Sequence, residues 1–136
     1  MVATRPSYRR GIRSRGPLLA VVFPTLVAGA GLMLLRGNES TAHGLLGFAL
    51  VVLGAPLLTV AGVPLRSGAG VYAAAAAGSA LLWFCIGVVA ARRATRDAIA
   101  TWRKFWGEYL VLLMAVWAGT VLALVAANLV LGRALI

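Results

Sequence analysis

The chain has 136 residues, of which 62% are hydrophobic and 12% are charged, and its mean hydropathy is +0.95. Globular chains carry about 25% charged residues, so this composition excludes a soluble globular domain. The net charge of +10 comes from 13 basic and three acidic residues. Because no soluble basic fold is available to enter a nucleic-acid groove, we expect no nucleic acid among the partners.

Side chains that could do chemistry are scarce. Cys85 is the single cysteine, which excludes an internal disulfide and a CxxC metal site. His43 is the single histidine, which excludes an HExxH helix, and the sequence has no P-loop, GxGxxG or GxSxG motif. We therefore expect no catalytic residue, no metal site and no cofactor, and we expect the protein not to be an enzyme.

The order of charges along the chain predicts the fold. Residues 1–15 hold five arginines among few apolar side chains, and we expect them to form a flexible basic arm. Residues 16–136 are expected to form a single transmembrane domain, because four uncharged stretches each exceed the roughly 17 to 20 residues that cross a hydrocarbon core. These stretches are 16–35, 40–65, 67–91 and 109–132. We predict an all-α integral membrane protein with four transmembrane helices, over about 18–35, 42–63, 71–91 and 109–131.

Two of the predicted helices contain a proline. Pro24 lies in the first helix, and Pro56 lies in the second, where it follows Gly54 and Ala55. A proline inside a membrane helix is tolerated when neighbouring groups satisfy the carbonyl that it leaves without a partner. We therefore expect both prolines to kink their helices rather than end them.

The segment 92–108 differs from the four apolar stretches. At helical spacing, Arg92, Arg96 and Arg103 share one face and the aromatic residues share another, which predicts a basic amphipathic helix at the head-group plane before the fourth transmembrane helix. Basic clusters beside a membrane attract anionic lipid head groups. The residues that we expect to contact anionic lipids are Arg92, Arg93, Arg96, Arg103, Lys104, Trp102 and Trp106.

Charge alone does not orient a chain with four spans. Counted along the sequence, seven basic residues would lie on one side of the membrane and six on the other. A re-entrant hairpin over residues 44–65, broken at Gly54, Ala55 and Pro56, would leave three spans and divide the basic residues ten to three. We favour four spans, because residues 42–65 carry no charge and a broken loop exposed to lipid would leave backbone groups unpaired.

Small residues recur at a spacing of four along two of the predicted helices. Such a ridge lets a second backbone approach closely. The fourth helix carries Ala115, Gly119, Ala123 and Ala127, and the third carries Ala73 with Ala77 and Ala74 with Gly78. We favour packing of these two helices against each other within the monomer. The alternative is that one ridge docks a different subunit.

Glu108 is the only acidic residue next to a long span. A carboxylate inside the membrane would indicate a proton-coupling site. Because Glu108 stands at the start of the fourth helix, one turn after Lys104, we instead expect an ion pair at the membrane interface.

The scarcity of reactive groups, the ridges and the balanced charge favour a function that works through partners. We expect a non-catalytic accessory or scaffolding subunit of a larger inner-membrane complex, such as an envelope lipid or solute transporter. Its partners would be larger membrane protein subunits and anionic lipids. The alternative is a small independent channel or transporter that forms a homo-oligomer. Arginine outnumbers lysine by 12 to one, and alanine, glycine and valine are abundant, which is typical of GC-rich bacterial coding sequences. We therefore expect a multi-pass protein of the bacterial inner membrane.

Overall fold

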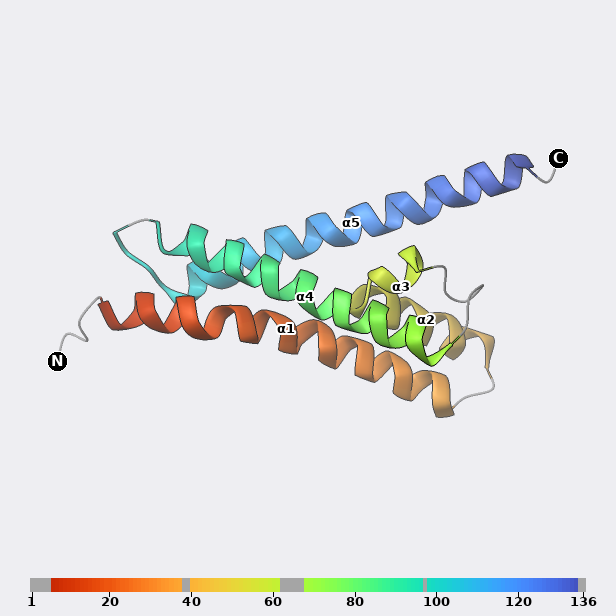
Figure 1. Ribbon diagram of the computed structural model, residues 1–136, viewed down its shortest axis with the longest axis horizontal. Helices are drawn as coiled ribbons and strands as arrows, with labels where there is room; N and C mark the ends of the chain where they lie inside the picture. The colour runs from red at the N-terminus through yellow and green to blue at the C-terminus, as the bar shows by residue number, and fades with distance from the viewer. Residues whose placement is uncertain (1–5, 38–39, 62–67, 97, 135–136) are drawn as a thin grey trace.

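A computed structural model of the chain describes residues 6–37, 40–61, 68–96 and 98–134 (Figure 1). All the regular elements in these ranges are α-helices, so the expected all-α class is confirmed. The helices are α1 (Pro6–Gly37), α2 (Thr41–Gly54), α3 (Leu57–Val60), α4 (Ala69–Ala94) and α5 (Trp102–Ala134). Three of them contain a stretch that is long and apolar enough to cross a membrane, at Tyr8–Arg36, Ala69–Ala94 and Trp102–Val130.

The three long helices alternate in direction, as Figure 1 shows. α1 runs from the N-terminus to the far end of the bundle, α4 runs back alongside it, and α5 runs away again to the C-terminus. The first turns of α1, the last turns of α4 and the first turns of α5 therefore lie at one end of the molecule, which we call the basic end. The last turn of α1 and the first turns of α2 and α4 lie at the opposite end, which we call the hairpin end.

The segment between α1 and α4 enters and leaves the bundle at the hairpin end. α2 starts there, and its N-cap residue Ser40 accepts a hydrogen bond from the His43 N–H. α2 stops at Gly54, and the short α3 turns back toward the start of α4. The 14 residues of α2 rise about 21 Å at 1.5 Å per residue, less than the roughly 30 Å of a hydrocarbon core. Together α2 and α3 form a hairpin, which we call the α2–α3 hairpin, that reaches only into the middle of the bundle.

This hairpin stands where the second of the four predicted spans was expected. Pro56 has no N–H to continue the helical hydrogen bonds, and the helix ends before it instead of kinking, so the expected single helix over 42–63 is wrong. The described residues contain three candidate spans, and a fourth is not shown. Residues 62–67, which include the end of the predicted second helix, lie outside the described ranges. Pro24, in contrast, lies inside α1 and does not end it, as expected.

The N-terminal arm is helical, rather than flexible, over its described part. α1 begins at Pro6, and residues 1–5 lie outside the described ranges. Ile12 is fully buried in a cluster with alanines of α4. Arg13 Nε donates a hydrogen bond to Thr95 Oγ1 at 3.1 Å. These contacts with α4 and with the residue after it extend the helix into a segment whose local composition favours a solvated coil.

Residues 92–108 do not form one interfacial helix, so that prediction is wrong. α4 continues to Ala94, and α5 begins at Trp102. The chain reverses direction between them, and Thr95 Oγ1 donates to the Ala91 carbonyl oxygen at 2.8 Å where α4 ends. The reversal turns the aromatic face of the first turns of α5 against α1 and α4. That face packs against protein, which is the physical reason that the segment does not continue as one helix from α4.

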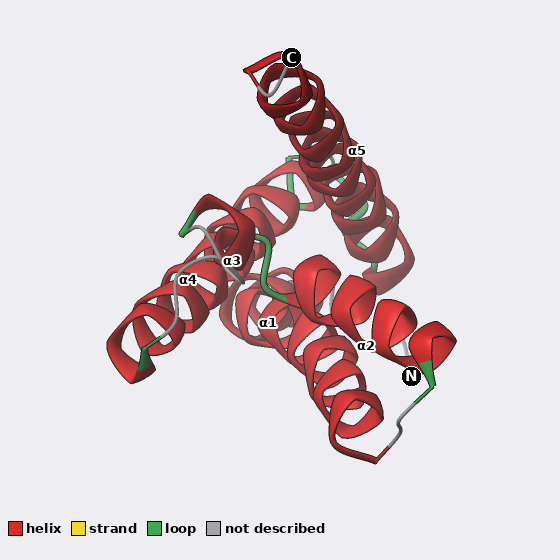
Figure 2. Ribbon diagram, turned by 90° about the vertical axis from the view of Figure 1, so that its right-hand side faces the viewer, coloured by secondary structure: helices red, strands yellow, loops and turns green. Residues whose placement is uncertain are grey.

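The main core lies in the half of the bundle near the basic end. It joins α1, α4 and α5 and consists of Ile12, Ala20, Trp83, Ala90, Ala91, Ala94, Phe105, Tyr109 and Leu113. A smaller cluster joins the α2–α3 hairpin to α4 and consists of Val51, Ala55, Leu58 and Ala75. Beyond the main core α5 leaves the other helices, and the view in Figure 2 shows its C-terminal half apart from them.

Candidate functional site

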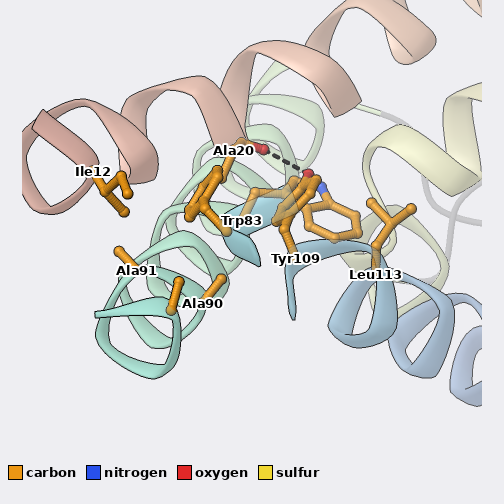
Figure 3. Packing of buried hydrophobic residues seen from close by; sticks show 9 residues of the cluster. Ile12, Ala20, Trp83, Ala90, Ala91, Tyr109 and Leu113 are labelled. Carbon is orange, nitrogen blue, oxygen red and sulfur yellow. Dashed lines mark hydrogen bonds between the residues drawn. The ribbon is translucent and has the colours of Figure 1, made fainter. Parts of the chain in front are cut away.

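A tyrosine hydroxyl satisfies the carbonyl that Pro24 leaves without a helical partner. In a regular helix the Ala20 carbonyl would accept the N–H four residues later, but that residue is a proline and has none. Tyr109 Oη instead donates to the Ala20 carbonyl oxygen at 2.8 Å, and the tyrosine is 1% exposed. Figure 3 shows this bond joining α5 to α1 inside the main core. The hydrogen bond therefore ties two helices together at a point where one of them has an incomplete backbone ladder.

Two tryptophans satisfy the carbonyls at the tip of the α2–α3 hairpin. Trp83 of α4 is 1% exposed, and its Nε1 donates to the Gly54 carbonyl oxygen at 2.8 Å. Trp117 of α5 donates from Nε1 to the Leu53 carbonyl oxygen at 3.1 Å. Both carbonyls belong to the last turn of α2, where the helix has no following residues to supply N–H groups.

On the other side of the break, a side chain accepts a hydrogen bond from the free backbone N–H. The Leu57 N–H, the first of α3, donates to Ser79 Oγ of α4 at 3.2 Å. A broken helix at membrane depth is tolerated only where the protein buries and pairs its free backbone groups. Side chains of α4 and α5 therefore form hydrogen bonds with the backbone groups that the break at Pro56 leaves free.

Glycines let α1 and α2 approach backbone to backbone. A Cβ atom added at Gly31 would lie 2.7 Å from the Gly47 carbonyl oxygen, and one added at Gly47 would lie 2.9 Å from the Gly31 carbonyl oxygen. Nearer the tip, a Cβ at Gly54 would lie 2.5 Å from the Pro24 carbonyl oxygen. These distances are too short for any side chain, so α2 can lie this close to α1 only because the three positions are glycine.

The two predicted ridges of small residues do not pack against each other in the monomer. The exposed members are Ala115, Gly119, Ala123 and Ala127 on α5, and Ala73, Ala74 and Ala77 on α4. A Cβ at Gly119 would meet no atom within 4 Å. Gly78 is half-buried, and a Cβ there would lie 2.8 Å from Leu57 Cδ1 of the hairpin. Docking of another subunit on the α5 residues remains a prediction.

The predicted lipid-contact cations have different surroundings at the basic end. Arg92, Arg96 and Arg103 are exposed, and Lys104 is half-buried. Arg93 Nη1 of α4 lies 3.8 Å from Glu108 Oε2 of α5. Glu108 therefore forms an ion pair, but its partner is Arg93 of another helix, whereas the sequence suggested Lys104, one turn away.

Trp102 and Trp106, also predicted to contact lipid, belong to a group of aromatic rings in contact with one another. Phe105 lies between them, with ring centroids 5.7 Å from Trp102 and 5.3 Å from Trp106, both edge to face. Phe105 is fully buried, and a Cβ at Gly16 of α1 would lie 2.8 Å from its ring. Trp106 is 36% exposed. The aromatic residues of this segment therefore pack α5 against α1, and Trp106 is also partly exposed at the surface.

An apolar cavity of about 560 Å³ lies between α1, the α2–α3 hairpin and the first half of α4. Its lining is aliphatic and aromatic and includes Leu35, Phe48 and Tyr72. None of the described residues that line it is charged. Its walls match lipid tails or an apolar helix, and among the described residues that line it Tyr72 carries the one titratable side chain.

The reactive side chains in the described part of the chain do not gather. His43 lies exposed at the start of α2, where its Nδ1 shares a hydrogen bond with Ser40 Oγ. Cys85 is exposed on α4. Across the described ranges, no three His, Cys, Asp or Glu residues lie together as a metal ion would require.

Sequence reasoning did not identify the residues that hold the hairpin. Pro56 and Gly54 indicate a helix break in the sequence, and a break inside the membrane requires hydrogen-bond donors from neighbouring helices. Indole N–H groups are donors only, which marks Trp83 and Trp117 as partners for free carbonyls. Gly47 and Gly54 also lie seven residues apart, which places them on one face of α2.

Comparison with models of protein families, with curated proteins and with solved structures finds no match to this chain.

Proposed function

We propose that the protein is a non-catalytic accessory subunit of a larger membrane complex, such as one that moves lipids or solutes across the bacterial envelope, and that α5 docks a transmembrane helix of a larger subunit. The observation that carries the proposal is that α5 leaves the bundle after its first half. Each side chain from Val121 to Val130 is exposed. Only 6% of the most apolar 18-residue window of α5 is buried, compared with 33% in α4.

The face that α5 offers supports close packing with another helix. It carries Ala115, Gly119, Ala123 and Ala127, which we call the α5 ridge. In a bilayer, helices associate through van der Waals contact rather than through the hydrophobic effect, and small residues let two backbones come close enough for that contact. The exposed residues from Val121 to Val130 rise about 15 Å at 1.5 Å per residue, so they can pair with a spanning helix over about half of the hydrocarbon thickness.

The interior of the bundle supports a structural role for the hairpin. In transporters, the free carbonyls of broken helices coordinate the transported ion. Here the carbonyls of Leu53 and Gly54 each accept a tryptophan N–H. The tip of the hairpin is therefore bound to α4 and α5.

The arrangement of the helices supports three spans with the basic end in the cytoplasm. By position in the sequence, ten of the 13 basic residues belong to the basic end, and Arg36, Arg66 and Arg133 belong to the other side. Cytoplasmic loops carry an excess of Lys and Arg, so this division orients the chain. The membrane would be the bacterial inner membrane. Four complete spans, expected from length alone, are the alternative, and cysteine labelling separates the two.

One observation favours a second candidate function, a small channel or transporter that acts as a homo-oligomer. Hairpins that enter the membrane halfway and break at Gly and Pro are a feature of transporters, and the α2–α3 hairpin has this form. In that case the α5 ridge would join copies of this chain.

The experiment that tests the proposal is purification of the tagged chain from native membranes in mild detergent. We expect larger membrane subunits to co-purify in fixed stoichiometry, and we expect Gly119→Leu to release them while the chain stays inserted. Val121→Leu, which enlarges an exposed residue on another face of α5, is the matched control and should retain them. Recovery of a homo-oligomer without other subunits supports the channel instead. Equal retention by both variants contradicts docking on the α5 ridge.

A further inference from the structure

Arginines about 80 positions apart in the sequence meet in one cavity at the basic end. The cavity has a volume of about 510 Å³ and is lined by Arg13 of α1 together with Val88, Ala91, Arg92 and Arg96. A second cavity of about 470 Å³ is lined by residues 9, 10, 13 and 14, so Arg13 belongs to both. The guanidinium groups form the polar wall, and Val88 and Ala91 form an apolar wall on the side of the membrane span. We call the first of these the arginine cavity.

A buried threonine holds Arg13 in this position. Arg13 Nε donates to Thr95 Oγ1 at 3.1 Å, and Thr95 is 2% exposed. The threonine hydroxyl itself donates to the Ala91 carbonyl oxygen at 2.8 Å. Arginine has five N–H donors, so the bond from Nε leaves the four N–H groups on the two Nη atoms for a ligand. Thr95 is therefore a positioning residue for the Arg13 guanidinium.

Within the described residues, no carboxylate balances the charges in the arginine cavity. Arg93 is paired with Glu108 at 3.8 Å and does not line the cavity. Within the described part of the chain, no carboxylate lies at ion-pair distance from Arg92 or Arg96. Three guanidinium groups around one space repel one another, and an anion between them turns that repulsion into attraction. Arginine forks bind the oxygens of a phosphate with paired hydrogen bonds.

We propose that the arginine cavity binds the phosphate head group of an anionic phospholipid, with Arg13, Arg92 and Arg96 on the phosphate and the acyl chains against Val88 and the apolar surface beyond it. The cavity volume falls within the roughly 300 to 1,000 Å³ of small-ligand sites. Val88 and Ala91 lie where the apolar stretch of α4 meets its first arginine, which is the depth of a lipid phosphate. A free phosphate ion would contact only the arginines, whereas a phospholipid would also contact the apolar wall. The proposal requires membrane insertion but not the accessory role.

The test uses the full chain, purified in mild detergent and exchanged into nanodiscs of phosphatidylcholine with or without phosphatidylglycerol. Native mass spectrometry counts the lipids that stay bound, and titration with short-chain phosphatidylglycerol gives an affinity. We expect the triple variant Arg13→Gln, Arg92→Gln, Arg96→Gln to lose at least about tenfold in affinity, because each bond between a guanidinium and a phosphate contributes more than a neutral hydrogen bond. The matched control, Arg10→Gln, Arg15→Gln, Arg36→Gln, removes three exposed charges that do not line the arginine cavity and should bind as the wild type does.

A second variant tests the geometry separately from the charge. Thr95→Val keeps the size of the buried side chain and removes the hydroxyl that holds Arg13, so we expect a loss of about threefold to tenfold, restored by Thr95→Ser. An equal loss in the triple variant and its control would show attraction by net charge alone and would overturn the site. Unchanged lipid binding in the triple variant would overturn it as well. Displacement of the lipid by an equal concentration of inorganic phosphate would assign the cavity to a soluble ligand instead of a lipid.

Discussion

The Tyr109 hydroxyl and the Ala20 carbonyl oxygen, 2.8 Å apart, join residues separated by 89 positions in the sequence at a place that a proline creates. Pro24 cannot donate to Ala20, and an aromatic side chain from the last helix takes over that role. The tip of the α2–α3 hairpin repeats the arrangement with indole N–H groups. Prolines therefore leave backbone groups free, and aromatic residues of later helices bind those groups and fix the packing of the bundle.

Replacing Tyr109 by Phe removes the hydroxyl and leaves the Ala20 carbonyl without a donor. We expect a loss of about 1 kcal/mol in the free energy of unfolding, the usual size for a hydrogen bond between membrane helices. In a Pro24→Ala background the loss should be smaller, because the new N–H can pair with Ala20. Unfolding in mixed micelles measures both values, and Tyr72→Phe, at an exposed tyrosine of α4, is the control. The same loss in both backgrounds would contradict the role given to Tyr109.

Replacing Trp83 by Phe removes the donor to Gly54 and leaves a void in the main core. We expect a loss of about 1 to 3 kcal/mol in the free energy of unfolding, from the unpaired carbonyl and the lost packing together. Trp106→Phe makes the same chemical change at a partly exposed residue that has no such hydrogen bond. It should cost less. If the two variants lose equal stability, the Trp83 indole does not hold the hairpin.

Two glycines one turn apart on α2 make a paired test of the contact with α1. Gly47→Ala places a methyl group 2.9 Å from the Gly31 carbonyl oxygen, whereas Gly44→Ala meets no atom within 4 Å. We expect Gly47→Ala to destabilise the protein by about 1 to 3 kcal/mol through overpacking. Gly44→Ala should leave stability unchanged or raise it slightly, since alanine favours helix. Thermal unfolding in detergent compares the two, and a reversed order would show that α2 is not packed against α1 through Gly47.

The sequence was sufficient to predict the three long helices, because each apolar stretch exceeds the length of a bilayer core and carries no charge. Local composition misjudged the start of α1, since Ile12 and Arg13 are held by α4 and Thr95, which lie about 80 residues away. Apolar length also suggested a span at 42–63, although Pro56 breaks the helix and its neighbours satisfy the break. Such pairings between distant residues carry no local signal.

Some residues of the candidate sites could likewise be predicted from the local sequence, and others could not. Arg92 and Arg96 could be named from their position beside a span, but the part played by Arg13 depends on the pairing of α1 with α4. The ridges of small residues were visible in the sequence, yet the close approach in the monomer uses glycines of α1 and α2 instead. A spacing pattern shows that a helix can pack closely, and it does not say against which partner.

The most direct test of the three-span arrangement is to measure whether the start of α2 and the start of α4 lie on the same side of the membrane. Single cysteines at Ser7, Thr41, Ala69 and Ala98, each in a Cys85→Ala background, can be labelled with a membrane-impermeant maleimide in intact spheroplasts and again after lysis. The re-entrant hairpin predicts that Thr41 and Ala69 label together in intact spheroplasts and that Ser7 and Ala98 label only after lysis. Labelling of Thr41 and Ala69 from opposite sides would show that residues 42–65 cross the membrane and would contradict the three-span arrangement.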